Sequence, residues 1–217
     1  MVIFEVCTET LAGAIAAEEG GAHRMELCSH LELDGLTPSS ELLLAVLDAV
    51  DIPVLCMARP YPGEFYYTET QFQNLLEDAQ RMKALGAHGL VSGLLTAEGA
   101  VDVAQLERLM EVADGLPVTF HRAFDYVEDA EAALEILIAH GVRRILTSGC
   151  RGNAEQGMDQ LKKLVELADG RVDIVLGGGV RAHNLKKLQQ ATGATEFHSS
   201  LDRHPTPESV RELVQSL

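Results

Sequence analysis

The sequence contains no tryptophan, few aromatic residues and only four cysteines in 217 residues. The cysteines are Cys7, Cys28, Cys56 and Cys150, and no two of them form a Cys-x-x-Cys pair. This spacing predicts neither a disulfide framework nor a ribbon-type zinc site. The chain also lacks a Walker motif, a His-Glu-x-x-His motif and a Gly-x-Ser-x-Gly elbow, so none of the enzyme classes that these motifs mark is indicated.

Basic residues are scarce, since 17 lysines and arginines face 33 aspartates and glutamates and the net charge is −16. No local basic patch offsets this balance, so we expect no binding to nucleic acid or to an anionic membrane surface. No apolar run is long enough to span a bilayer, and no basic leader precedes the first apolar stretch. We therefore expect a cytoplasmic protein.

A short β-rich run followed by a longer segment with helical periodicity occurs eight times along the chain. The expected strands cover residues 2–7, 23–28, 53–58, 89–93, 116–121, 143–147, 173–176 and 195–198. Alternating strands and helices predict a parallel sheet, and eight units are the number that closes a (β/α)8 barrel of the TIM type. At roughly 27 residues for each unit the loops must be short. We predict a compact single-domain α/β barrel over residues 1–217; an open doubly wound sheet is the alternative.

Two helix starts carry capping signals. Thr68 with Gln71 is typical of a capping box, and it precedes apolar residues that repeat at helical spacing over residues 72–85. Thr37 before Pro38 predicts a second start, with threonine as the N-cap and proline in the first turn.

Polar residues gather where the predicted strands end, above all in the cluster Thr119 to Asp125. In a barrel, the carboxyl ends of all strands surround one mouth, so residues far apart in the sequence meet there. The residues expected at this mouth are Glu5, Cys7, Glu26, Cys28, Arg59, His121, Arg122, Asp125, Thr147, Ser148, Gly149, Gly177, Gly178, Gly179, His198 and Ser199.

The same stretches carry a family resemblance. They are Glu-Val-Cys at 5–7, Met-Glu-Leu-Cys at 25–28, Gly-Leu-Thr-Pro at 35–38, Arg-Pro at 59–60, Thr-Phe-His-Arg-Ala-Phe-Asp at 119–125, Arg-Ile-Leu-Thr-Ser-Gly at 144–149, Gly-Gly-Gly-Val at 177–180 and Glu-Phe-His-Ser-Ser at 196–200. Together they resemble the CutC family over nearly the whole chain. The resemblance implies a (β/α)8 barrel, a cytoplasmic location, a homo-oligomer of two or more subunits and a role in copper homeostasis.

The chain departs from the family pattern at three places. Asp34 stands where the family usually has a glycine, Tyr61 where it has a second arginine, and Leu176 where it often has a proline. The loss of an arginine removes one cation from the predicted mouth and weakens any anion site implied by the resemblance.

Cys7 and Cys28 are the candidate metal ligands. They end two strands that should be neighbours, about 4.8 Å apart at the backbone. Two thiolates at this spacing suit a soft ion such as Cu(I), the cofactor or cargo that the family's role in copper homeostasis favours. The alternative is that both are buried and act as small hydrophobic residues, as we expect for Cys56.

Acid/base residues form a second candidate set. Glu5 and Glu26 precede the two cysteines by two positions and share their strand face; if that face is inward, they enter the core below the mouth. A buried carboxylate needs a cationic partner or a raised pKa, and we expect Arg59 or Arg122 to be that partner. With His121, Asp125 and His198 they form either a catalytic acid/base group or a structural ion-pair network.

A glycine-rich loop, Gly177 to Gly179, follows the seventh strand and lies next to Ser199 at the end of the eighth. In barrels this loop commonly holds a phosphate on backbone N–H groups, and Thr147, Ser148 and Gly149 could add donors. The alternative is a tight turn that needs glycine. The sequence thus supports two functions: a copper protein, which the family resemblance places first, or an enzyme acting on a small anionic or phosphorylated metabolite.

Overall fold

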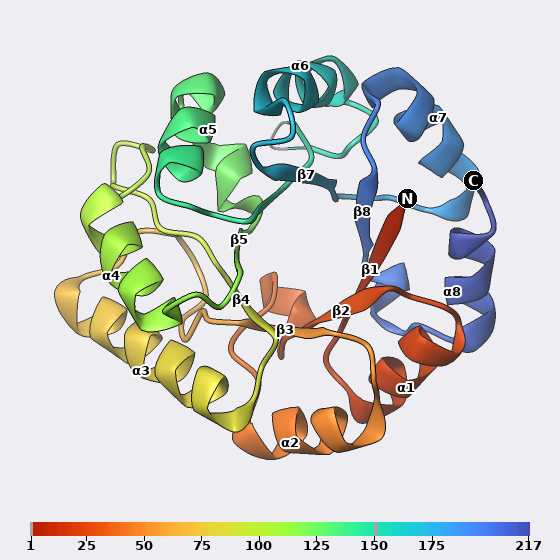
Figure 1. The fold of residues 1–217 in the computed structure, drawn as a ribbon, viewed down its shortest axis with the longest axis horizontal. Helices are drawn as coiled ribbons and strands as arrows, with labels where there is room; N and C mark the ends of the chain where they lie inside the picture. Colours follow the sequence, from red (N-terminus) through yellow and green to blue (C-terminus); the bar gives the residue numbers. More distant parts are fainter. Residues whose placement is uncertain (1, 150–151) are drawn as a thin grey trace.

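The structure is a computed structural model that describes residues 2–149 and 152–217, so Cys150 lies outside the described residues. Eight strands pair in chain order, every pair is parallel, and the last strand pairs with the first. The strands form a closed ring surrounded by helices (Figure 1). The predicted (β/α)8 barrel is confirmed, and the open sheet is excluded because β1 pairs with β8.

The strands overlap the predicted ranges, and their bounds differ from them by no more than two residues. They are β1 (Ile3–Thr8), β2 (Arg24–Leu27), β3 (Val54–Met57), β4 (Gly89–Ser92), β5 (Val118–Phe120), β6 (Arg144–Thr147), β7 (Asp173–Leu176) and β8 (Glu196–Ser199).

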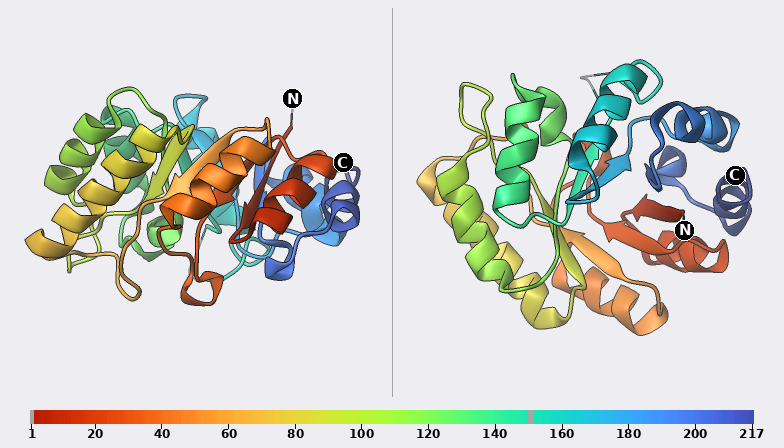
Figure 2. Two further views of the ribbon diagram at one scale, coloured as in Figure 1. Left: turned by 90° about the horizontal axis from the view of Figure 1, so that it is seen from below. Right: turned by 45° about the horizontal axis from the view of Figure 1, so that its top comes forward.

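One α-helix follows each strand. These are α1 (Leu11–Glu19), α2 (Ser40–Ala49), α3 (Glu69–Leu85), α4 (Val103–Ala113), α5 (Ala130–Ala139), α6 (Met158–Ala168), α7 (Ala182–Thr192) and α8 (Pro207–Val214). Short 3-10 helices, η1 (Leu31–Leu33), η2 (Arg122–Tyr126) and η3 (Leu201–Arg203), follow β2, β5 and β8. Helices α2, α3 and α4 lie side by side on the outside of the ring (Figure 2). Within the described residues, no helix combines the length and apolar character that a membrane span requires.

Helix α3 confirms the helix that the capping signal and the apolar spacing predict. Thr68 and Gln71 form the expected capping box, and the apolar residues Phe72, Leu75 and Met82 are buried. The other predicted start is wrong, because α2 begins at Ser40 with Ser39 as its N-cap. The hydroxyl of Thr37 instead accepts the backbone N–H of Arg59 at 2.9 Å, so it serves the end of the neighbouring β3 strand.

The barrel interior is polar on the side where β1, β2 and β8 meet. Arg24 of β2 donates to Glu5 at 2.5 Å and lies 2.7 Å from Glu196 of β8. All three side chains are buried, so the charges compensate each other out of contact with water. This ion-pair layer forms a floor beneath the carboxyl ends of the strands.

Candidate functional site

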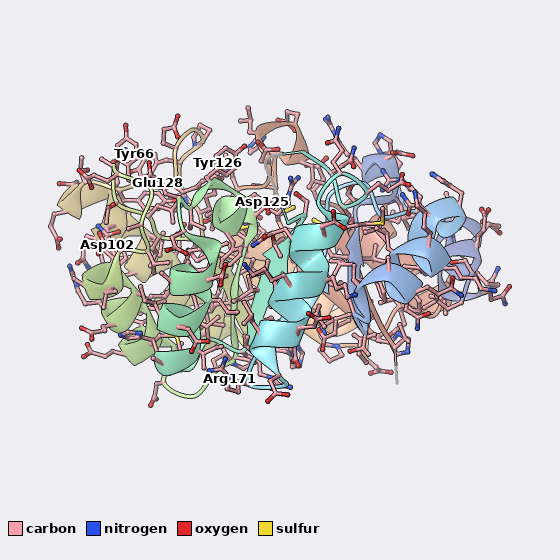
Figure 3. The ribbon with its side chains drawn as sticks, turned by 90° about the horizontal axis from the view of Figure 1, so that it is seen from above. Tyr66, Asp102, Asp125, Tyr126, Glu128 and Arg171 are labelled. Carbon is pink, nitrogen blue, oxygen red and sulfur yellow. The ribbon has the colours of Figure 1, made fainter. Side chains whose placement is uncertain are left out.

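A cavity of about 240 Å³ opens at the carboxyl ends of the strands. Tyr66 and Tyr126 lie at this end of the molecule, whereas Arg171, which precedes β7, lies at the opposite end (Figure 3). The cavity is lined by residues from the ends of several strands and the loops that follow them: Cys7, Glu26, Leu31, Asp34, Met57, Phe65, His121, Arg122, Tyr126, Leu146, Gly178, Gly179, Arg181, His198, Ser199 and Ser200.

The two cysteine sulfurs meet under this cavity. Cys7 Sγ lies 3.6 Å from Cys28 Sγ and donates to Glu26 Oε1 at 3.3 Å. Both cysteines are buried, and of the two only Cys7 lines the cavity. The neighbouring Cys28 thiol, burial and the Glu26 carboxylate raise the pKa of Cys7 well above its usual value, so this thiol is protonated when no metal is bound.

Cys7, Glu26 and His198 present a possible set of metal ligands. One donor atom from each of the three side chains lies within 4.8 Å of the others. Burial raises the pKa of Glu26, and its Oε2 has no hydrogen-bond partner among the described residues. A buried carboxylate oxygen without a partner is costly, so this atom is available to a ligand or a metal ion in the cavity.

Glu5 lies deeper and is bonded on both oxygens, to Arg24 at 2.5 Å and to His198 Nδ1 at 2.7 Å. Burial raises its pKa, but Arg24 and His198 lower it further, to about 2, so Glu5 is a carboxylate. The expectation that Arg59 or Arg122 neutralises the two glutamates is wrong. Arg24 has this role for Glu5 because it pairs directly across from it in the β1–β2 register.

Arg59 lies outside the cavity and braces two loops. Its guanidinium donates to the backbone carbonyls of Leu33 and Gly35 after β2 and of Gly63 after β3. It also lies over the ring of Phe65, 5.1 Å from the centroid. Arg59 therefore holds the shape of the rim, and its predicted catalytic role stays a prediction.

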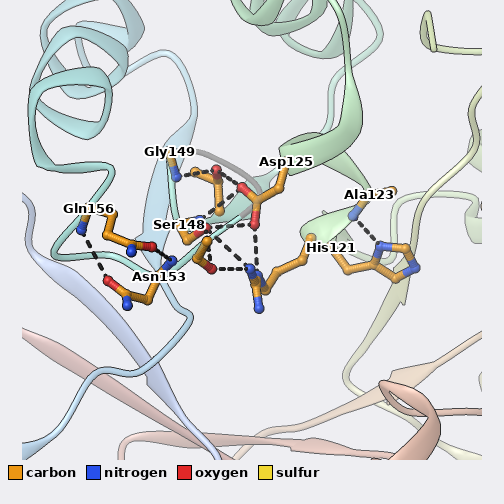
Figure 4. Close-up of polar contacts among 10 residues, drawn as sticks. His121, Ala123, Asp125, Ser148, Gly149, Asn153 and Gln156 are labelled. Carbon is orange, nitrogen blue, oxygen red and sulfur yellow. Dashed lines mark hydrogen bonds and ion pairs between the residues drawn. The ribbon is translucent and has the colours of Figure 1, made fainter.

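Asp125 joins η2 to the end of β6 (Figure 4). Its carboxylate accepts from Thr147 Oγ1, from Ser148 Oγ and the Ser148 backbone N–H at 2.9 Å each, and from Arg122 Nε at 2.7 Å. The Thr147 hydroxyl in turn accepts from the N–H of Gly149. The two hydroxyls are thus engaged with Asp125. Thr147 and Ser148 lie against the glycine loop, but none of Thr147, Ser148 and Gly149 lines the cavity, so their predicted role as anion donors stays a prediction.

His121 lines the cavity wall opposite the cysteines. Its Nδ1 accepts the backbone N–H of Ala123 at 3.0 Å (Figure 4), so the ring proton of the neutral form is on Nε2. Burial and the positive charge of Arg59 lower its pKa to about 3, which keeps the imidazole neutral. Its ring packs against Phe65, with 5.0 Å between the ring centroids.

Only part of the glycine loop reaches the cavity. Gly177 is tied to β6 by its N–H, which donates to the carbonyl of Thr147 at 3.0 Å. Gly178, Gly179 and Ser199 line the cavity. Gly178 has a φ of +82°, and a Cβ there would lie 2.9 Å from Ser148 Cβ, so the turn requires glycine.

Sequence reasoning missed Arg24 and the aromatic residues Phe65 and Tyr126 as parts of this end of the barrel. Alternation places Arg24 on the same strand face as Glu26, which is a usable signal for an inward charge. Phe65 lies on a loop and Tyr126 ends the short 3-10 helix η2, so neither carries a periodic signal.

Comparison with known proteins indicates a single protein family. The sequence profile of the CutC family matches residues 2–203. The human protein "Copper homeostasis protein cutC homolog" is 45% identical over 198 residues, which cover 91% of this chain and 72% of the human chain.

Comparison with solved structures agrees with this family match. The CutC protein of Streptococcus agalactiae superposes with a TM-score of 0.88 at 32% identity, covering 92% of this chain and 99% of that chain. Thiamine phosphate pyrophosphorylase from Pyrococcus furiosus has a TM-score of 0.67 at 14% identity, with 99% and 95% of the two chains covered. At that identity the second likeness concerns the barrel fold alone.

Proposed function

The chain belongs to the CutC family of copper homeostasis proteins, and on that premise we propose that it binds Cu(I) directly, with Cys7 and Cys28 as thiolate ligands. The observation that carries the proposal is the 3.6 Å separation of the two sulfur atoms directly beneath the mouth cavity. Sulfur ligands are the ones that Cu(I) prefers. Copper is the cargo of this site.

The surroundings of the two sulfurs fit a cation. Glu26 and His198 line the same cavity as Cys7 and can bind an arriving ion beside the thiolates. The Glu26 carboxylate also compensates positive charge in a buried position. Because the pKa of Cys7 is raised, copper binding must release a proton from this thiol, and the apparent affinity should fall as the pH falls.

Anaerobic titration with Cu(I) against a competing chelator tests the proposal. We expect Cys7→Ser and Cys28→Ser each to weaken binding by more than about tenfold, since even residues that only support a ligand cost that much. Cys56→Ala is the matched control, because Cys56 is buried in β3 and does not line the cavity. Equal affinity in all four proteins would exclude the thiolate site.

The proposal includes a cytoplasmic location and assembly into a homo-oligomer, as the resemblance to the family implies. A thiolate copper site suits a reducing compartment, where the two neighbouring thiols stay unoxidised. Sedimentation velocity of the purified protein measures the oligomeric state directly. A monomer at all accessible concentrations would contradict that part of the proposal.

A further inference from the structure

His121 presents a hydrogen-bond donor that no described residue uses. Its Nδ1 is occupied by the N–H of Ala123, so Nε2 carries the proton, and Nε2 has no partner among the described residues. The side chain is only 5% exposed and lines the mouth cavity. An unmade hydrogen bond from a buried donor costs about 1–3 kcal/mol, so a molecule in the cavity that brings an acceptor to Nε2 would relieve this cost.

Further donors lie where the loops after β7 and β8 meet the same cavity. Gly178, Gly179 and Ser200 line it, and within residues 2–149 and 152–217 no group accepts their backbone N–H groups. Gly178 and Gly179 both have positive φ angles, which turn the backbone of this loop sharply. Successive N–H groups in such turns form concave sites for anions.

Charge and size limit what fits. Arg122 and Arg181 also line the cavity, but they pair with Asp125 and Asp202, and the cavity lining includes Asp34 as well. The attraction for an anion therefore comes from oriented N–H groups and not from a net positive charge. The cavity, about 240 Å³, is smaller than the usual site for a drug-sized ligand. A single carboxylate or phosphate group on a small molecule suits these limits, whereas a polyanion does not.

We infer that the mouth cavity binds a small organic oxyanion, with one oxygen accepting from His121 Nε2 and the anionic group held by the N–H groups of Gly178, Gly179 and Ser200. The anion would share the cavity with Cys7, Glu26 and His198, but none of the four residues that hold it is a proposed metal ligand. It assigns the glycine loop and His121 to one ligand that spans the cavity from β5 to β7 and β8.

Titration of the ¹⁵N-labelled protein with inorganic phosphate and, separately, with pyruvate tests the inference by NMR. Both anions should shift the amide signals of Gly178, Gly179 and Ser200, and pyruvate, which adds a ketone oxygen, should also shift the His121 ring nitrogens. Propionate, which lacks that oxygen, distinguishes the carboxylate contact from the ketone contact. Comparing phosphate with the two carboxylates identifies the preferred anion.

His121→Asn is the decisive variant, because asparagine can still accept the N–H of Ala123, but its shorter side chain ends before the position of Nε2 and places no donor there. We expect it to bind pyruvate about tenfold more weakly, the cost of one hydrogen bond to a charged ligand. His88→Asn is its matched control: His88 Nδ1 likewise accepts a backbone N–H, that of Val54, but at the opposite end of the barrel.

Shifts centred on the three loop amides, reduced affinity in His121→Asn and unchanged affinity in His88→Asn would support the site. The absence of shifts at these amides in the wild-type protein, with both anions in the tens of millimolar range, would overturn it whether or not a variant folds. Cys7→Ser should keep anion binding and His121→Asn should keep Cu(I) binding. The two proposals therefore fail independently.

Discussion

Arg24 is the residue on which the charged interior depends. It is 5% exposed and pairs with the buried Glu5 and Glu196. Replacing Arg24 by glutamine leaves the buried Glu5 without its main cation, so we expect the free energy of unfolding to fall by about 3–5 kcal/mol. Urea unfolding measures this change.

Arg171→Gln is the matched control, because the pair between Arg171 and Glu135 is exposed to solvent. Little change is expected there. If Arg24→Gln were as stable as Arg171→Gln, the interior ion pairs would not contribute to stability.

His121 should make stability depend on pH. Its pKa is 6.5 in the unfolded chain and about 3 in the folded protein. Below pH 6.5 the imidazole therefore binds a proton in the unfolded chain but stays neutral in the folded protein. Stability is therefore lost as the pH falls, by up to about 1.4 kcal/mol per pH unit. His121→Asn should have a flatter profile than the wild-type protein between pH 6.5 and 4.5, above the range where Glu5 titrates. Parallel profiles from urea unfolding would contradict the buried neutral imidazole.

For single residues, the sequence predicted the position of a side chain in the barrel better than the residue with which that side chain pairs. Alternation along β1 and β2 correctly placed Cys7 near Cys28 and put Glu5 on the same strand face as Cys7, which the structure shows to be buried. The partner of Glu5 depends on the stagger between neighbouring strands, which sets Glu5 opposite Arg24. That stagger follows from closure of the whole barrel and not from alternation within one strand.

Among the elements, α3 offers a direct test of a capping signal. The Thr68 side chain accepts the N–H of Gln71, and the Gln71 side chain accepts the N–H of Thr68. Thr68→Ala should lower the free energy of unfolding by about 1 kcal/mol, whereas Thr68→Ser, which keeps the hydroxyl, should be close to the wild-type protein. Urea unfolding of the three proteins measures both values. Equal losses in the two variants would mean that the cap does not stabilise the helix.

Thr37 illustrates why the other capping signal misled. Its local sequence, threonine before proline, is as suitable as that of Thr68, but its hydroxyl accepts the N–H of Arg59, which follows β3 and is 22 positions away in the sequence. Competition between a local cap and a distant backbone group is decided by tertiary packing, so it is not visible in a short sequence window.

For the whole molecule, the repeated units predicted the barrel because eight successive β-α segments leave few other closed arrangements. The net charge of −16 makes a further prediction for the proposed homo-oligomer. Like charges repel when subunits associate, and salt screens this repulsion, so the dissociation constant should fall as salt rises. Sedimentation velocity at low and high salt checks this, and weaker association at high salt would contradict it.

The pairing of β1 with β8 has a consequence for synthesis on the ribosome. The edge of β1 and the acidic side chain of Glu5 remain without β8 and His198 until nearly the whole chain has emerged. An unpaired strand edge is a site for wrong association. Nascent chains stalled before residue 196 should thus be held by chaperones or aggregate, and release should follow translation of the final strand.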